Sequence, residues 1–108
     1  MVIQRLDQFK DGWFIGDFSP SLLRTKKFEV AVKYHKKDEH YAAHYQLKAV
    51  EYNVLIKGTM HINDQPVYAG DVFVIEPGEV AKPRFSSDCI VVCVKVPSIP
   101  LDKITVEE

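Results

Sequence analysis

The sequence predicts an all-β fold, an antiparallel sandwich or barrel, and three observations lead to this prediction. Short segments rich in β-branched and aromatic residues recur along the chain. Turn residues such as Gly, Asn, Asp and Pro separate them at nearly even intervals. Helix signals are weak throughout, the best being a single turn over 19–27. Short, evenly spaced segments of this kind are typical of antiparallel sheets that pack or close on themselves.

The expected strands follow from composition and from the turns that bound them. They cover residues 13–18, 28–34, 43–47, 51–56, 59–62, 65–68, 71–76 and 89–96. Asn63 and Asp64 stand between two of them, and both residue types tolerate positive φ, so we expect a tight hairpin there. We divide the chain into an N-terminal arm with a strand and a turn (1–27), a barrel (28–96) and a C-terminal arm (97–108) that packs on the barrel or frays.

Bulk properties limit the function classes. A chain of 108 residues with 46% hydrophobic and 27% charged residues is most simply one globular domain. The net charge is −1 and no basic patch runs through the chain, which argues against nucleic-acid binding. The longest clear apolar run, IVVCV, is too short to span a membrane or to serve as a leader. We therefore expect a cytoplasmic protein with no nucleic-acid or membrane partner.

Cys89 and Cys93 are expected to be free thiols. They lie four residues apart in one predicted strand, which separates them by roughly 13 Å at about 3.3 Å per residue. That distance is too long for a disulfide between them. Both are interpreted as small apolar strand residues of a reducing compartment.

The strand at 51–56 has two faces, and the residue pattern leaves their directions open. By alternation Tyr52, Val54 and Ile56 share one side, while Glu51 and Asn53 share the other. Either the apolar side forms the core and Glu51 meets water, or Glu51 and Asn53 line a pocket. In the second case another sheet or a second subunit must cover the apolar side.

A spaced set of polar residues and a glycine includes this strand. His44-Tyr45-Gln46 is followed by four residues, then Glu51, then six residues, then Gly58. This order resembles the first motif of the cupin family, which runs histidine-x-histidine, three or four residues, glutamate, six residues, glycine. Gln46 stands where the family has its second histidine.

The second cupin motif is matched eleven residues further on. Gly70-Asp71 opens a predicted strand that ends at Pro77-Gly78, as in the family's Gly-Asp, strand, Pro-x-Gly order. The family's third histidine falls on Ala81. The match covers roughly residues 28–96, and the chain is therefore identified as similar to small single-domain, RmlC-like cupins. This resemblance implies an antiparallel double-stranded β-helix, also called a jelly-roll barrel, with a pocket in its mouth.

The resemblance also implies a divalent metal, such as zinc, iron, manganese or nickel, in that pocket. Its ligands here would be His44, Gln46 and Glu51, with none at Ala81. An amide oxygen is a weak neutral ligand, and catalytic sites typically use three protein ligands. A weakened metal site and a pocket without metal both remain open. The other histidines, at 35, 40 and 61, are expected on the surface or in hydrogen bonds.

Three functions follow from these residues. The first is binding of a small polar metabolite, carbohydrate-like or carboxylate, by His44, Gln46, Glu51, Asn53 and Arg84; the guanidinium suits an anionic group. The second is an enzyme, either a metal-dependent dioxygenase or isomerase, or a metal-free acid-base catalyst, with His44 and Glu51 as the catalytic residues. The third is self-association: the resemblance and the apolar side of 51–56 point to a homodimer.

Overall fold

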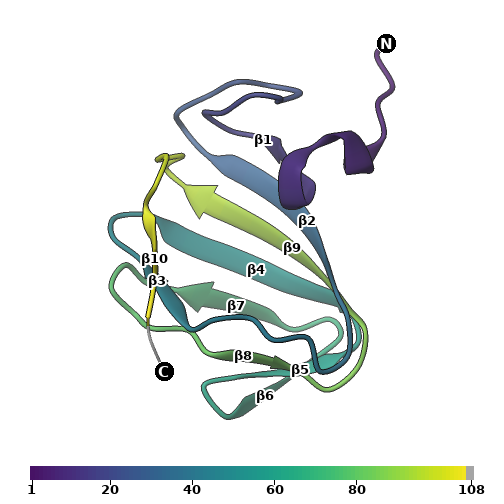
Figure 1. Cartoon of the computed structure of the whole chain (residues 1–108), viewed down its shortest axis with the longest axis vertical. Coiled ribbons are helices and arrows are strands. Elements are labelled where there is room, and N and C mark those ends of the chain that lie inside the picture. The colour runs from purple at the N-terminus through teal and green to yellow at the C-terminus, as the bar shows by residue number, and fades with distance from the viewer. Residues whose placement is uncertain (107–108) are drawn as a thin grey trace.

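The computed structural model describes residues 1–106 as a barrel of ten strands preceded by two short 3₁₀ turns (Figure 1). The turns are η1 (Leu6–Gln8) and η2 (Lys10–Gly12). The strands are β1 (Trp13–Ile15), β2 (Glu29–His35), β3 (His44–Gln46), β4 (Val50–Lys57), β5 (Thr59–Ile62), β6 (Gln65–Tyr68), β7 (Val72–Ile75), β8 (Pro83–Phe85), β9 (Cys89–Val96) and β10 (Lys103–Thr105). The predicted all-β fold is confirmed. The helical turn expected over 19–27 is wrong, because that segment is an irregular loop between β1 and β2.

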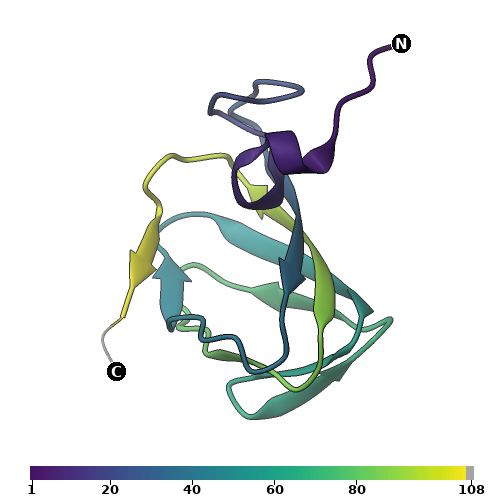
Figure 2. The same cartoon turned by 45° about the vertical axis from the view of Figure 1, so that its right-hand side comes forward.

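One large sheet and two small sheets enclose the interior. The large sheet has the order β1-β2-β9-β4-β7, and the small ones are β10-β3 and β6-β5-β8. Every strand pair is antiparallel. An isolated bridge between His44 and Ala81 joins the β3 side to the segment before β8, so the two cupin-like motifs meet on the same wall. Figure 2 shows β10 beside β3, where the C-terminal arm adds a strand to the barrel.

Two turns confirm the local predictions. Asn63 and Asp64 both have positive φ, 49° and 66°, and they connect β5 to β6 with Ile62 opposite Gln65. Gly58 has φ 97°, and a Cβ there would lie 2.3 Å from the carbonyl oxygen of Asp88. A side chain cannot fit at that distance, so the motif glycine is required by the sharp turn between β4 and β5.

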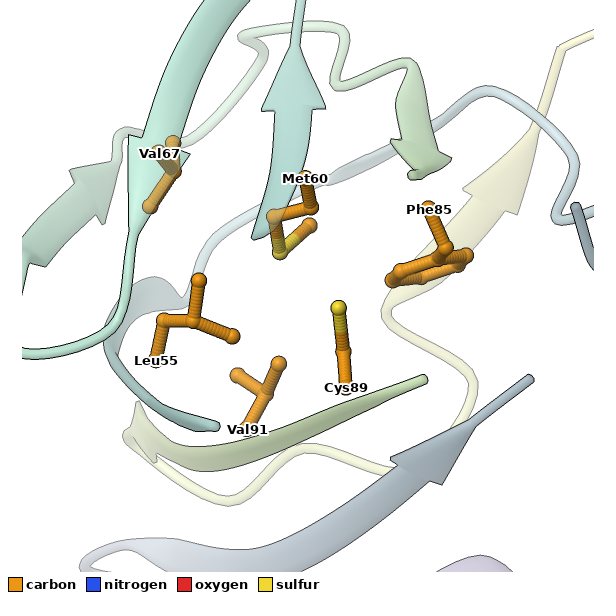
Figure 3. Packing of buried hydrophobic residues seen from close by; sticks show 6 residues of the cluster. All are labelled: Leu55, Met60, Val67, Phe85, Cys89 and Val91. Carbon is orange, nitrogen blue, oxygen red and sulfur yellow. The ribbon is translucent and has the colours of Figure 1, made fainter. Parts of the chain in front are cut away.

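The apolar core fills one end of the barrel. Figure 3 shows its six residues, Leu55, Met60, Val67, Phe85, Cys89 and Val91. Leu55 is fully buried and Phe85 is 2% exposed. Removing a buried side chain of this size destabilises a protein by about 2–5 kcal/mol. The core therefore anchors β4, β5, β8 and β9.

The outer face of the large sheet is apolar. Alternation places Tyr34 of β2, Tyr52 and Ile56 of β4, and Val72 and Val74 of β7 on this side, where all five are exposed. The inner side of β4 carries Glu51, Asn53 and Leu55, which are buried. The structure thus selects the second of the two orientations that the sequence left open. Within residues 1–106, no helix is long and apolar enough to cross a membrane.

Candidate functional site

A cavity of about 1380 Å³ lies inside the barrel beside the apolar core, and Met60, Phe85 and Val91 of that core line part of it. Its walls come from the large sheet, from β3 and β10, and from the N-terminal turns. Side chains along each strand point alternately to the two faces of the sheet, so the inward side chains of β2, β9, β4 and β7 form rows across the large sheet. One row is Glu29, Lys95, Glu51 and Ile75, and the next is Ala31, Cys93, Asn53 and Phe73.

Lys95 is a buried lysine on β9, the strand between those of Glu29 and Glu51. It is 8% exposed, its backbone pairs with both Glu29 and Glu51, and its Nζ lies 3.9 Å from Glu29 Oε1. Ser98 donates its hydroxyl to Glu29 at 2.9 Å. Burial, acting against these partners, raises the pKa of the Glu29 carboxyl. The row therefore places positive charge directly beside the glutamate of the first cupin-like motif.

Trp13 of β1 covers the lysines of this wall. The ammonium of Lys95 lies 4.8 Å from its ring centre and that of Lys33 lies 5.7 Å away. Both distances suit cation–π attraction. Lys33 lines the cavity as well, and within residues 1–106 no carboxylate lies within 4 Å of its Nζ.

Glu51 is held in place by its neighbours in the next row. Asn53 donates its side-chain N–H to Glu51 Oε2 at 3.1 Å. Burial first, and then the Glu51 charge, hold the pKa of the Cys93 thiol well above its usual range, and the thiol hydrogen-bonds to this carboxylate. Cys93 is therefore a neutral thiol rather than a nucleophile. Both cysteines are free and buried, as expected.

His44 presents one ring nitrogen to the cavity. Its Nδ1 lies 3.1 Å from the carbonyl oxygen of Ala42, and because a carbonyl only accepts, Nδ1 carries the proton. The Nε2 atom is then the unprotonated nitrogen of the neutral ring. Burial lowers the pKa of His44, outweighing the opposite effect of the Ala42 hydrogen bond. The imidazole is therefore neutral near pH 7 and can accept a proton or a hydrogen bond.

Tyr41 contacts His35, His44 and the side chain of Lys103. Its ring makes edge contacts with His35 and His44, at centroid distances of 5.3 and 5.5 Å. Its hydroxyl accepts a hydrogen bond of 2.7 Å from Lys103 Nζ. Burial raises the pKa of the Tyr41 phenol and lowers that of the Lys103 ammonium. The phenol stays protonated, and the amine loses its proton more readily than a solvated lysine does.

His35 is hydrogen-bonded, as one of its two expected roles has it, but it is buried and not in a solvated loop. It ends β2 with a side chain only 9% exposed, stacked on Phe85 at a centroid distance of 4.1 Å. Its Nδ1 lies 2.8 Å from Glu39 Oε2. The alternation of side chains along β2 points His35 into the barrel. The charged residues that follow it in the sequence had suggested a solvated loop. His61 interacts with Ser86 Oγ at 3.3 Å, and His40 is exposed, as expected.

The structure brings together some of the predicted site residues and separates others. His44, Glu51 and Asn53 line one cavity. Gln46 points inward but is 1% exposed and lies outside the cavity lining, and its side-chain amide has no hydrogen-bond partner within the described residues. Arg84 is exposed on β8 and also lies outside the lining, because the alternation of β8 turns Phe85 inward instead. Arg84 is therefore not positioned to bind a ligand in this cavity.

The residues of the cavity do not fit a divalent metal held by the cupin-like motifs. Within residues 1–106, no three His, Cys, Asp or Glu side chains converge as metal ligands. His44 and Glu51 supply two donors, Ala81 supplies none, and Gln46 lies outside the lining. Two donors fall short of the three that catalytic sites typically use.

Comparison with known proteins supports the fold. No protein-family model matches the chain, and no curated protein matches it in sequence. Among solved structures, a conserved protein with a double-stranded β-helix domain from Klebsiella pneumoniae superposes with a TM-score of 0.72 at 21% identity. The match covers 98% of this chain and 92% of the other.

Two further structures share the fold within longer chains. The DMSP lyase DddQ from Ruegeria pomeroyi gives a TM-score of 0.71 at 13% identity, over 86% of this chain and 49% of the lyase. The bacterial pirin YhhW from Escherichia coli, solved in complex with nickel(II), gives 0.65 at 18% identity, over 81% of this chain and 39% of the pirin. An RmlC-like cupin from Desulfovibrio desulfuricans also matches, with a TM-score of 0.62 at 18% identity, over 69% of this chain and 76% of the other. The chain therefore has the double-stranded β-helix fold of the RmlC-like cupins.

Proposed function

We propose that this barrel binds a small polar metabolite that carries a carboxylate, and that it does so without a metal. The observation that carries the proposal is a pair of cavity lysines that have no ion-pair partner among the described residues. Lys33 and Lys103 line the cavity, and within residues 1–106 neither has a carboxylate within 4 Å of its Nζ. An ammonium group without a counter-ion in a partly desolvated cavity favours an anionic ligand.

The remaining lining suits the rest of a small metabolite. His44 offers a neutral acceptor, and Asn53 and Tyr41 offer hydrogen-bonding groups. Phe73 and Phe85 supply apolar surface. Between the two ligand classes that the sequence indicated, the lysines favour a carboxylate over a neutral carbohydrate, because a hydrogen bond between an ammonium and a carboxylate is stronger than one between an ammonium and a sugar hydroxyl.

Calorimetric titration tests the proposal directly. Lactate and succinate would be compared with glucose, each with and without Ni²⁺ or Zn²⁺, on protein purified without a metal-chelate column. We expect binding of one or both acids, no binding of glucose, and no dependence on metal. Lys103→Met should weaken acid binding, whereas Lys57→Met, which removes an exposed lysine at the far end of β4, should not.

Other outcomes would point elsewhere. Equal binding of glucose by the wild type and Lys103→Met would support the carbohydrate class and overturn the proposal. Binding only when metal is present would support the metal-dependent enzyme instead, with His44 and Glu51 as its ligands.

We also propose that two copies associate through the apolar outer face of the large sheet. Four strands spaced by about 4.8 Å, with up to eight residues of about 3.3 Å each, cover on the order of 400–500 Å² in projection. The largest exposed apolar patch of a monomer is typically about 300–600 Å² and is often functional, and this one supplies roughly half of the about 800 Å² per partner of a standard interface. A second copy offers the same apolar surface, which a partner with an ordinary charged surface does not.

A further inference from the structure

We propose that the preferred ligand of this cavity is an amphipathic monocarboxylate, in which an apolar body is attached to the acid group. This inference rests on the proposed function, since the cavity lysines named there bind the acid group. It adds the chemistry of the rest of the ligand, which apolar side chains inside the barrel bind.

Three apolar side chains of the cavity wall point inward and are only half-buried. Phe73 of β7 stands opposite Asn53 in an inward row of the large sheet. Ile62 of β5 lies on the same side of its strand as the buried Met60. Tyr41, which precedes β3, is the third. All three pack against the apolar core and line the cavity, so the surface that the fold leaves uncovered lies inside the barrel.

This part of the wall favours an apolar group over water. Met60, Phe85 and Val91 of the core, labelled in Figure 3, continue the apolar lining. Removing apolar surface from water is favourable in proportion to the area that is covered. A hydroxyl or a second carboxylate placed against the same side chains would lose hydrogen bonds to water without gaining others. The wall therefore selects a ligand whose body is hydrocarbon.

The size of the cavity also favours a ligand larger than lactate or succinate. Pockets that bind drug-sized molecules typically measure about 300–1,000 Å³. This cavity measures about 1380 Å³. An acid as small as lactate would fill a minor part of it and would leave the half-buried Phe73 and Ile62 in contact with water. A longer acid covers these side chains while its carboxylate stays with the lysines.

Tyr41 marks where the acid group and the apolar body meet. Its hydroxyl accepts a hydrogen bond of 2.7 Å from Lys103 Nζ, which lies 4.5 Å from the centre of the same ring, and both contacts suit an ammonium. The ring also makes an edge contact with Phe85 of the core, at a centroid distance of 6.4 Å. One aromatic ring thus separates the ammonium from the core. A carboxylate bound to Lys103 can therefore direct its hydrocarbon body along the Tyr41 ring toward Phe85.

Calorimetric titration of the full chain with propanoate, butanoate and hexanoate tests the inference, because these acids differ only in the length of the hydrocarbon. Affinity should rise about fourfold for each CH₂ group that becomes buried, and at least tenfold from propanoate to hexanoate. The heat-capacity change of binding should become more negative along the series. Ile62→Asn makes part of the apolar wall polar, so hexanoate should lose most of this gain while propanoate binds unchanged. Leu47→Asn is the matched control and should behave like the wild type, because Leu47 has the same size but is exposed and outside the cavity lining.

The outcomes separate this inference from the proposed function. If lactate or succinate binds and hexanoate binds no tighter than propanoate, the apolar body is wrong while carboxylate binding stands. If hexan-1-ol, which lacks the acid group, binds as tightly as hexanoate, the carboxylate is not recognised and both proposals fail. Both also fail if none of the acids binds. The series on the wild type depends on no variant, and circular dichroism checks that Ile62→Asn is folded; a folded Ile62→Asn that keeps the full gain with chain length would overturn the inference.

Discussion

Replacing Asp102 should destabilise the barrel and loosen β10 beside β3. This carboxylate is 6% exposed, and both of its oxygens accept backbone N–H groups from the turn after β3. These hydrogen bonds connect the C-terminal arm to the 47–49 turn, and no sequence pattern indicated this contact. Without it, the backbone N–H of Ala49, a residue 1% exposed, loses its partner.

The expected magnitude follows from these bonds. A hydrogen bond to a charged group contributes about 1.5–3 kcal/mol, and Asp102 holds two N–H groups, of which that of Lys48 can reach water. Asp102→Ala should therefore lower the free energy of unfolding by about 3 kcal/mol. For a domain of this size, that shifts Tm by roughly 12 °C, at about 4 °C per kcal/mol. Asp102→Asn keeps one acceptor and should lose about half as much.

Urea unfolding followed by Trp13 fluorescence measures the effect. Asp88→Ala is the matched control, because Asp88 also accepts a backbone N–H, that of Lys37, at 2.9 Å but at an exposed position. The control should lose less than about 1 kcal/mol. A loss in Asp102→Ala no larger than in the control would refute the argument that this carboxylate fixes β10.

Three further predictions concern the metal, the pH dependence and the assembly. Gln46→His with Ala81→His completes the histidine set of the cupin motifs, and elemental analysis should then find bound nickel that the wild type lacks; an unchanged metal content would show that these side chains do not converge. Burial lowers the pKa of His44, so the unfolded chain binds a proton more readily, and the free energy of unfolding should fall as pH drops from about 6.5 through that lowered pKa. In His44→Gln the decline over this range should be shallower, and identical curves would contradict the assignment. Tyr52→Glu places a charge in the apolar outer face, and light scattering should show a dimer for the wild type and a monomer for the variant; equal masses would exclude this face as the interface.

The fold could be predicted because its signals are local. Alternation along each strand and turn residues such as Asn63-Asp64 act within a few residues of one another. The spacing of the cupin-like motifs placed His44 and Glu51 in one pocket, and both line the same cavity. The bridge between His44 and Ala81 also lies where the motifs predict the third ligand position.

The cavity lysines escaped prediction for two physical reasons. In 89–96 every residue except Lys95 is apolar, so neither face of that strand is polar, and alternation could not tell which one lines a pocket. The outer face is apolar as well, which reverses the usual rule that the apolar side is the inner one. Lys103 depends on a pairing with β3 more than fifty residues away, which no local pattern encodes.

Lys95 itself is better explained by ligand binding than by stability. Its single ion pair within the described residues, with Glu29, is long at 3.9 Å, and desolvating two charges usually offsets what such a pair contributes. Removing Lys95 alone would leave Glu29 buried and unpaired, so the informative variant is Lys95→Met with Glu29→Leu. Replacement of a buried pair by apolar residues is often neutral or stabilising by about 1–4 kcal/mol. We expect this double variant to unfold at equal or higher urea concentration and to bind succinate more weakly, as measured by denaturation and calorimetry. A less stable protein with unchanged succinate affinity would assign the pair to the fold instead of the ligand.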